Sequence, residues 1–348
     1  MALRNNKTIN RLATLPVGIF GCTVAIAGLA NAFKAGHSLF GIPAGLATAI
    51  TFICWFIFLG LKISYGLKWY LFPDNVAAEL ANPVTSHFAG TFFISTVLIA
   101  GLTAEFSLDT ARIVWLIGAV GSLVFVLLLT SRLFNGQVTD SGAVPAILIP
   151  GLTVLNAGTA STAMGFGVDG YHADIFLFSI GIVYTLTFFV LIAYRLIHFE
   201  PLSNFLKPSL LLMCAPFEIG FQTYVSLTHR VDLFASVIFY FGFFIFIVLF
   251  FHVFTKSLRF ETSWWGACFS TGALTNAALR YAMLSPDPVI KVIAAVMLLV
   301  LIGLVLLTGY YSLFYLFFPS PGKPSERNTA STSPASDISP VERSKKVA

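Results

Sequence analysis

The chain has 348 residues, of which 57% are hydrophobic and only 10% are charged, and its mean hydropathy is +0.88. About a quarter of the residues of a water-soluble domain are charged, so this composition excludes an ordinary soluble protein and favours a lipid environment. The formal net charge is +5. The four cysteines are not spaced as metal ligands or as a disulfide framework, which indicates small apolar residues within the membrane.

Ten runs are apolar and long enough to cross a bilayer, which takes about 20 residues. They cover residues 13–33, 43–66, 85–104, 110–134, 145–167, 174–198, 208–229, 232–255, 263–284 and 289–317. We therefore expect a short cytoplasmic segment, 1–12, a ten-helix membrane domain, 13–318, and a cytoplasmic tail, 319–348. The tail is rich in Ser, Pro and charge, a composition typical of disorder.

The distribution of Lys and Arg predicts the orientation. Ten spans place both termini on one side of the membrane, and fifteen of the twenty Lys and Arg residues fall on that side. Cytoplasmic loops carry the excess of these residues, so both termini are expected in the cytoplasm of a plasma membrane or bacterial inner membrane. This topology accounts for the basic charge, and no nucleic-acid partner is expected.

Two kinds of span alternate along the chain. In twenty-residue windows, the odd-numbered spans hold 45 Gly, Ala, Ser or Thr per 100 residues, and the even-numbered spans hold 26. Small residues let membrane helices approach closely, whereas bulky ones suit a surface that faces lipid. The sequence therefore predicts an all-α membrane fold of five helical hairpins, with odd helices inside and even helices outside. Five such inner helices enclose either a central pore or a tightly packed core.

Prolines in the odd spans favour the pore slightly. Pro16, Pro150 and Pro216 lie at the start of these spans or within them. A proline inside a span frees a carbonyl group, which is tolerated where that group meets protein or a watery cavity.

One helical stripe of the ninth span carries a bulky ring, a gap, an amide and a cation. Phe269, Gly272 and Ala273, Asn276, and Arg280 stand at offsets of 0, 3–4, 7 and 11, which places them on one helix face. Arg280 would lie ~17 Å beyond Phe269, near the outer mouth. The cation either snorkels to the interface or attracts anions into an outer vestibule. The ring is either a packing residue or a gate.

The same span carries a family resemblance. Its stretch WWGACFSTGALTNAALRYA resembles the ninth helix of the slow anion channel, or tellurite-resistance (TehA) and C4-dicarboxylate transporter, family. The stretches ANPVTSHF and CAPFEIGFQTY resemble the segments that lead into the third helix and open the seventh, with Asn82 in place of a histidine. The opening of the first span is similar to the family pattern at Pro16, Gly18, Phe20 and Gly21.

This resemblance implies a homotrimer in which each chain conducts or transports small inorganic or organic anions, such as malate, sulfite or tellurite, through a pore lined by odd helices. It implies no cofactor and no covalent chemistry, and we expect no metal site. A phenylalanine occludes the family's pore, and Phe269 matches it. The expected pore-lining residues are Phe20, Gly21, Pro150, Asn156, Pro216, Gly272, Ala273 and Asn276. The spans contain no paired acid–base, metal-ligand or nucleophile–base motif, so we expect no enzyme.

Glu218 does not suit a simple anion pore, because a carboxylate at mid-membrane would repel anions. Three interpretations remain open. In the first, the side chain is protonated or hydrogen-bonded and stabilises the packing of helices. In the second, it contacts a cation or a neighbouring subunit. In the third, it carries protons. The last would make the protein a proton-coupled transporter or exporter of dicarboxylate, sulfite or tellurite. Asn156 and Gln222 supply either polar contacts to an anion or hydrogen bonds between helices.

Overall fold

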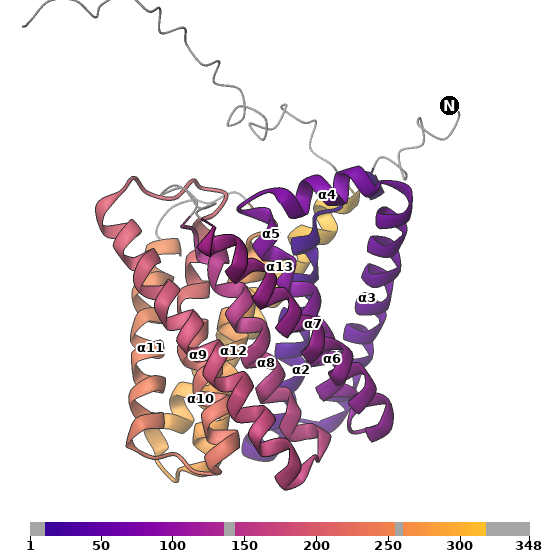
Figure 1. The fold of residues 1–348 in the computed structure, drawn as a ribbon. Coiled ribbons are helices and arrows are strands. Elements are labelled where there is room, and N and C mark those ends of the chain that lie inside the picture. The colour runs from indigo at the N-terminus through magenta and orange to yellow at the C-terminus, as the bar shows by residue number, and fades with distance from the viewer. Residues whose placement is uncertain (1–10, 136–142, 255–259, 318–348) are drawn as a thin grey trace, which may run out of the picture. The chain divides into compact units, whose positions relative to one another are not determined.

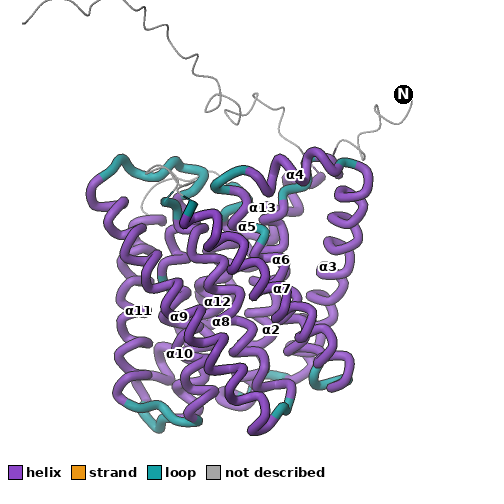
Figure 2. Tube along the Cα trace, in the orientation of Figure 1, coloured by secondary structure: helices purple, strands orange, loops and turns teal. Residues whose placement is uncertain are grey.

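The computed structural model describes residues 11–135, 143–254 and 260–317 (Figure 1). All regular structure within these ranges is helical, and no strand is found there (Figure 2). Contacts divide the chain into two units, Met1–Gly309 and Tyr310–Ala348, and all helices except the end of α13 belong to the first. The predicted tail and the first ten residues lie outside the described ranges.

The helices follow one another in the order expected from the apolar runs. The principal ones are α2 (Phe20–Phe40), α3 (Ala44–Leu71), α6 (Gly90–Thr103), α7 (Leu108–Phe134), α8 (Ile149–Ser161), α9 (Gly167–His198), α10 (Ala215–Thr228), α11 (Leu233–Phe254), α12 (Trp264–Leu284) and α13 (Pro288–Phe317). Nine helical segments of the described chain are long and apolar enough to cross a membrane. The protein is therefore a multi-pass membrane protein. The helix α12 has a comparable length of 21 residues but is not among the nine, because small and polar residues lower its hydropathy.

Short 3-10 turns precede the helices of the first, fifth and seventh predicted spans. They are η2 (Val17–Ile19) before α2, η4 (Pro145–Leu148) before α8, and η6 (Lys207–Met213) before α10. Pro150 and Pro216 occupy the first turn of α8 and of α10. A proline costs little there, since the first N–H groups of a helix have no partner within the helix. These two prolines thus start their helices and do not bend a helix interior.

Five helices contact one another in a closed ring. The contacts run from α2 to α6, from α6 to α8, from α8 to α10, from α10 to α12, and from α12 back to α2 (Figure 1). The spans that contain α2, α6, α8 and α10 are 61 to 83% buried, whereas those of α3, α7, α9, α11 and α13 are 22 to 39% buried. Burial therefore follows the alternation of small and bulky residues in the sequence.

Each less buried helix lies against a ring helix that neighbours it in sequence. The pairs α2 and α3, α6 and α7, α8 and α9, and α10 and α11 are in contact. The side chain of Thr275 in α12 donates a hydrogen bond of 3.1 Å to the carbonyl of Met297 in α13. Neighbours along the chain are thus also neighbours in space.

Two features differ from the predicted ranges. The helix α2 continues to Phe40, seven residues beyond the expected end, because Lys34, His37 and Ser38 interrupt the apolar run without breaking the helix. Gly41 then ends it in a left-handed conformation with φ 69°, which glycine adopts at low cost. The helix α4 (Pro73–Ala81) lies between the second and third predicted spans, where the sequence predicts no helix.

A buried ion pair fastens the chain before α2 to α3 and α4. Lys68 Nζ lies 2.7 Å from Glu79 Oε2 and also donates to the carbonyl of Leu15 at 2.7 Å. Glu79 accepts further hydrogen bonds from the backbone N–H of Val17 and from the hydroxyl of Tyr65. Because the side chain of Lys68 is only 3% exposed, its charge depends on these partners.

Candidate functional site

A cavity of about 850 Å³ opens within the ring of helices and is lined by residues of α2, α3, α6, α8, α10 and α12. The stripe predicted on the ninth span faces this cavity. Phe269, Gly272, Ala273, Asn276 and Arg280 all line it, as their spacing on one helix face requires. The small side chains of the odd spans thus leave open space at this level.

Phe269 stands at the deep end of the cavity. It is the lining residue nearest to the N-terminal end of α12, and only 9% of its surface is exposed. The corresponding residues on the other ring helices are Val24 of α2, Leu98 of α6, Asn156 of α8 and Ile219 of α10. Four apolar side chains and one amide therefore surround the floor of the cavity.

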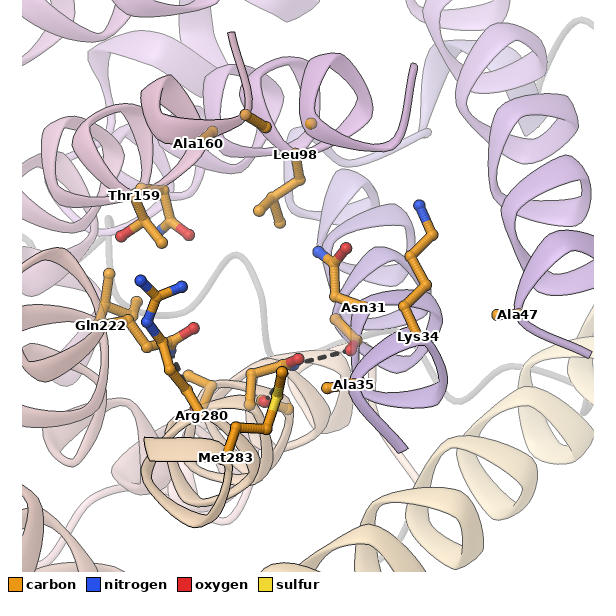
Figure 3. Close-up of a pocket in the computed structure, with 18 of the residues that line it drawn as sticks. Asn31, Lys34, Ala35, Ala47, Leu98, Thr159, Ala160, Gln222, Arg280 and Met283 are labelled. Carbon is orange, nitrogen blue, oxygen red and sulfur yellow. Dashed lines mark hydrogen bonds between the residues drawn. The ribbon is translucent and has the colours of Figure 1, made fainter. Parts of the chain in front are cut away.

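The charged groups of the cavity are unequally compensated. Lys34 Nζ lies 3.0 Å from Glu105 Oε2, so one cation is paired at the mouth. Arg280 forms no ion pair within the described ranges, and its Nε has no hydrogen-bond partner there. Figure 3 shows its guanidinium extending into the cavity on the side of Gln222 and Thr159, with Asn31 and Lys34 on the opposite wall. The uncompensated charge at the cavity wall is positive.

Close approach between two helices accounts for part of the small-residue pattern. A Cβ atom added to Gly28 of α2 would lie 3.7 Å from the Cα atom of Gly272 in α12. Asn276 reinforces this contact, since its Nδ2 donates to the carbonyl of Gly28 at 2.8 Å. The small residues of α12 therefore serve both helix packing and the open space beside it, which were the two alternatives for the odd spans.

Four of the predicted pore-lining residues do not line this cavity. Phe20, Gly21, Pro150 and Pro216 are buried near the N-terminal ends of their helices, beyond Phe269. Their role in lining a pore stays a prediction.

A cation missed in the sequence lies beside Phe20. Lys62 of α3 points towards α6, where its Nζ donates to the carbonyl of Phe92 and to Thr96 Oγ1, both at 2.9 Å. The ammonium also lies 4.9 Å from the ring centre of Phe20 and 5.0 Å from that of Phe58. A lysine surrounded by aromatic faces is stabilised by cation–π attraction.

Glu218 lies next to the cavity wall but outside the cavity. Its residue is fully buried, and neither carboxylate oxygen has a hydrogen-bond partner in the described part of the chain. A Cβ atom added to Gly242 of α11 would lie 3.5 Å from Glu218 Cγ, so the side chain faces α11. Its neighbours Ile219 and Gln222 face the cavity instead.

The mouth of the cavity was the part least visible in the sequence. Asn31, Lys34 and Glu105 line it, yet Lys34 and Glu105 fall outside the predicted spans. The spacing of Asn31, Lys34 and Ser38 at intervals of three and four would have placed them on one face of an extended first helix. Within the described ranges, no group of three or more His, Cys, Asp or Glu residues is placed to hold a metal ion.

Comparison with known proteins identifies the family. The sequence model of the family described as voltage-dependent anion channel matches residues 14–313 of this chain, which is most of its length. The chain belongs to this family.

Individual relatives are distant but cover most of the chain. The tellurite resistance protein TehA homolog of Haemophilus influenzae is 25% identical over 322 residues, covering 89% of this chain and 94% of the relative. The S-type anion channel SLAH1 of Arabidopsis thaliana is 23% identical over 326 residues, covering 86% and 82%. SLAH3 of the same plant is 22% identical over 307 residues; these cover 85% of this chain but only about half (48%) of SLAH3.

Proposed function

We propose that the protein is an anion channel, or a channel-like transporter, in which small anions pass along the cavity and Phe269 closes its deep end. One observation carries the proposal: the cavity within the ring of five helices has Phe269 of α12 as the one phenyl group among its described lining residues, at its deep end, and an uncompensated arginine in its wall. The family relationship and the names of the relatives, anion channels and a tellurite resistance protein, support it.

The mechanism is electrostatic and steric. Arg280 raises the local concentration of anions in the cavity, because an unpaired charge in a low-dielectric cleft focuses its field there. Weak contacts with neutral polar groups then hold the ion loosely, since a tight site would stop conduction. Rotation of the Phe269 phenyl group away from the axis would open a path towards Phe20 of α2 and Lys62 of α3.

The proposal includes the architecture. Ten membrane helices, α12 among them, form five hairpins, with the helices of the closed ring inside and their less buried neighbours outside. Both termini lie in the cytoplasm of a cell membrane, in keeping with the excess of Lys and Arg on that side. The functional form is a homotrimer, each chain with its own pathway, as the family resemblance implies.

An electrical measurement tests this function. The protein is reconstituted in planar bilayers with a gradient of potassium nitrate across the membrane, and the reversal potential is read. An anion pathway shifts this potential towards the equilibrium potential of nitrate, and the shift is independent of a pH gradient. Phe269→Ala should increase the nitrate current without changing the reversal potential. A reversal potential that follows potassium would contradict the proposal.

The alternative is a proton-coupled carrier of small anions that uses Glu218. The observation that favours it is the burial of this carboxyl group without a partner among the described residues. Carboxyl groups inside membranes often belong to proton paths. In a coupled carrier the reversal potential would shift with a pH gradient, and Glu218→Gln would abolish that shift.

A further inference from the structure

Two amide side chains in the cavity have their hydrogen-bond donors directed into protein. Asn276 Nδ2 donates to the carbonyl of Gly28 and to that of Gly272, both at 2.8 Å. Gln222 Nε2 donates to the carbonyl of Ala273 at 3.1 Å and to that of Glu218 at 3.3 Å. An amide nitrogen has two N–H groups, so both donors of each side chain are used.

The orientation of these two amides follows from their neighbours. Each nitrogen lies between two backbone carbonyl groups, and reversing the amide would put its oxygen against two other oxygens. The amide oxygens, Asn276 Oδ1 and Gln222 Oε1, accept no hydrogen bond from any described residue, and neither is enclosed by the protein. Both residues line the cavity, so these oxygens are acceptors open to it.

A cavity that attracts anions therefore presents acceptors as well as donors. Asn276 and Arg280 are four residues apart on α12, one turn along the same helix face. Gln222 joins this group through its hydrogen bond to Ala273, three residues before Asn276. Chloride or nitrate can bind the guanidinium but offers no hydrogen to an amide oxygen, and the lone pairs of that oxygen repel it.

Donors remain at both ends of the group. Arg280 forms no ion pair within the described chain, and its guanidinium group extends into the cavity (Figure 3). Asn156 Nδ2 donates to the carbonyl of Leu152 at 2.8 Å, and no second acceptor for it is found in the described ranges, so one N–H is left over for a ligand. A ligand that satisfies the whole group needs an anionic oxygen and a hydroxyl hydrogen.

We propose that the cavity selects anions that carry a hydroxyl group, such as hydroxycarboxylates or hydrogen-oxyanions. The anionic oxygen accepts from Arg280, and the hydroxyl group donates to the amide oxygen of Asn276 or Gln222. This substrate class rests on the proposed function, since it assumes that anions enter this cavity. The preference depends on the two amides, whereas the attraction of anions in general depends on Arg280.

The test compares two anions that differ only in the hydroxyl group. Glycolate and fluoroacetate have nearly the same shape, both are ionised at pH 7.5, and the fluorine of the second donates no hydrogen bond. Each is added, to either side in turn, to bilayers that carry a nitrate current through the Phe269→Ala protein. The concentration that halves the nitrate current measures competition for the cavity, whether or not the competitor itself passes through.

We expect the half-blocking concentration of glycolate to be about 2- to 10-fold lower than that of fluoroacetate, the range for one neutral hydrogen bond. Gln222→Met or Asn276→Leu should make the half-blocking concentrations of glycolate and fluoroacetate nearly equal. Two variants are used because one of them could fail to fold. Arg280→Gln should weaken both competitors alike. Asn75→Leu changes an amide outside the cavity that donates to the carbonyl of Ala13, and it should keep the difference.

Each of the other possible outcomes refutes either the proposed function, the selectivity for hydroxyl groups, or the assignment of that selectivity to the two amides. Absence of any nitrate current in a folded protein would refute the proposed function itself. A nitrate current blocked equally by both anions would leave the proposed function standing and refute the selectivity. A preference for glycolate that persists in both amide variants would refute the assignment to Gln222 and Asn276.

Discussion

Neutralising Arg280 should lower anion conductance, and the loss should depend strongly on salt. The side chain lies at the cavity wall without an ion-pair partner among the described residues, so Arg280→Gln leaves no carboxylate uncompensated. An anion in contact with the guanidinium, about 4 Å away, gains about 1 to 4 kcal/mol at effective dielectric constants of 80 to 20. Phe269 is eleven residues earlier on the same helix, about 17 Å away, where the gain falls to about 0.2 to 1 kcal/mol.

The charge thus acts mainly on the entry of anions and much less at the floor. Screening shortens its reach, because the Debye length is about 30 Å at 0.01 M salt and about 3 Å at 1 M. Since 1.4 kcal/mol corresponds to tenfold, a loss of 1 kcal/mol predicts a conductance about fivefold lower at 0.01 M. At 1 M the conductance should change less than about twofold.

Single-channel recordings in the Phe269→Ala background measure this directly. Arg280→Lys keeps the charge and should keep most of the conductance. Arg230→Gln removes a charge from an exposed side chain that does not line the cavity, and it should have little effect. The electrostatic reasoning is refuted if Arg280→Gln lowers the conductance equally at 0.01 M and 1 M, or if Arg230→Gln has the same effect.

Three further predictions concern other charged groups. Glu105→Gln frees Lys34 from its ion pair and should raise anion conductance at low salt, whereas an unchanged conductance would show that the mouth does not limit entry. Lys68→Met leaves the carboxylate of Glu79 without its cation and should lower the free energy of unfolding in detergent by about 3 kcal/mol; a loss below about 1 kcal/mol would contradict the role of this pair. Under a pH gradient, the Glu218→Gln variant and the wild type should have the same nitrate reversal potential. A pH-dependent shift of this potential that the wild type shows and the variant lacks would favour the coupled carrier.

The sequence was most informative where composition and helical period agree. The contrast between small and bulky spans predicted which helices are buried, because side-chain size decides how closely helices pack in lipid. The period of α12 likewise predicted that Phe269, Asn276 and Arg280 share one face, and all three line the cavity. These predictions needed only the local geometry of a helix.

Features that depend on contacts between distant segments were not predictable. The pairing of Lys34 with Glu105 requires α2 to continue past its apolar run, and the sequence gives no sign of which acid the lysine meets. The direction in which Glu218 points, towards α11 and away from the cavity, depends on the packing of Gly242 against α10. The orientation of the Asn276 amide is set by the carbonyl of Gly28, 248 residues earlier in the chain.

The helix α4 was missed although its start carries local signals. Pro73 occupies the first turn and Asp74 follows it, both common at helix starts. The helix has only nine residues, which is too short to cross a membrane or to show a clear apolar period.

The central claim is that the ring of Phe269 closes the deep end of the cavity. The most direct test compares the nitrate current of Phe269→Ala with that of Phe239→Ala, which removes an equally large, fully buried ring outside the cavity. The account predicts that Phe269→Ala raises the current at least about tenfold, equivalent to a barrier lower by about 1.4 kcal/mol, while Phe239→Ala does not. Equal currents in the wild type and in a folded Phe269→Ala protein would contradict it.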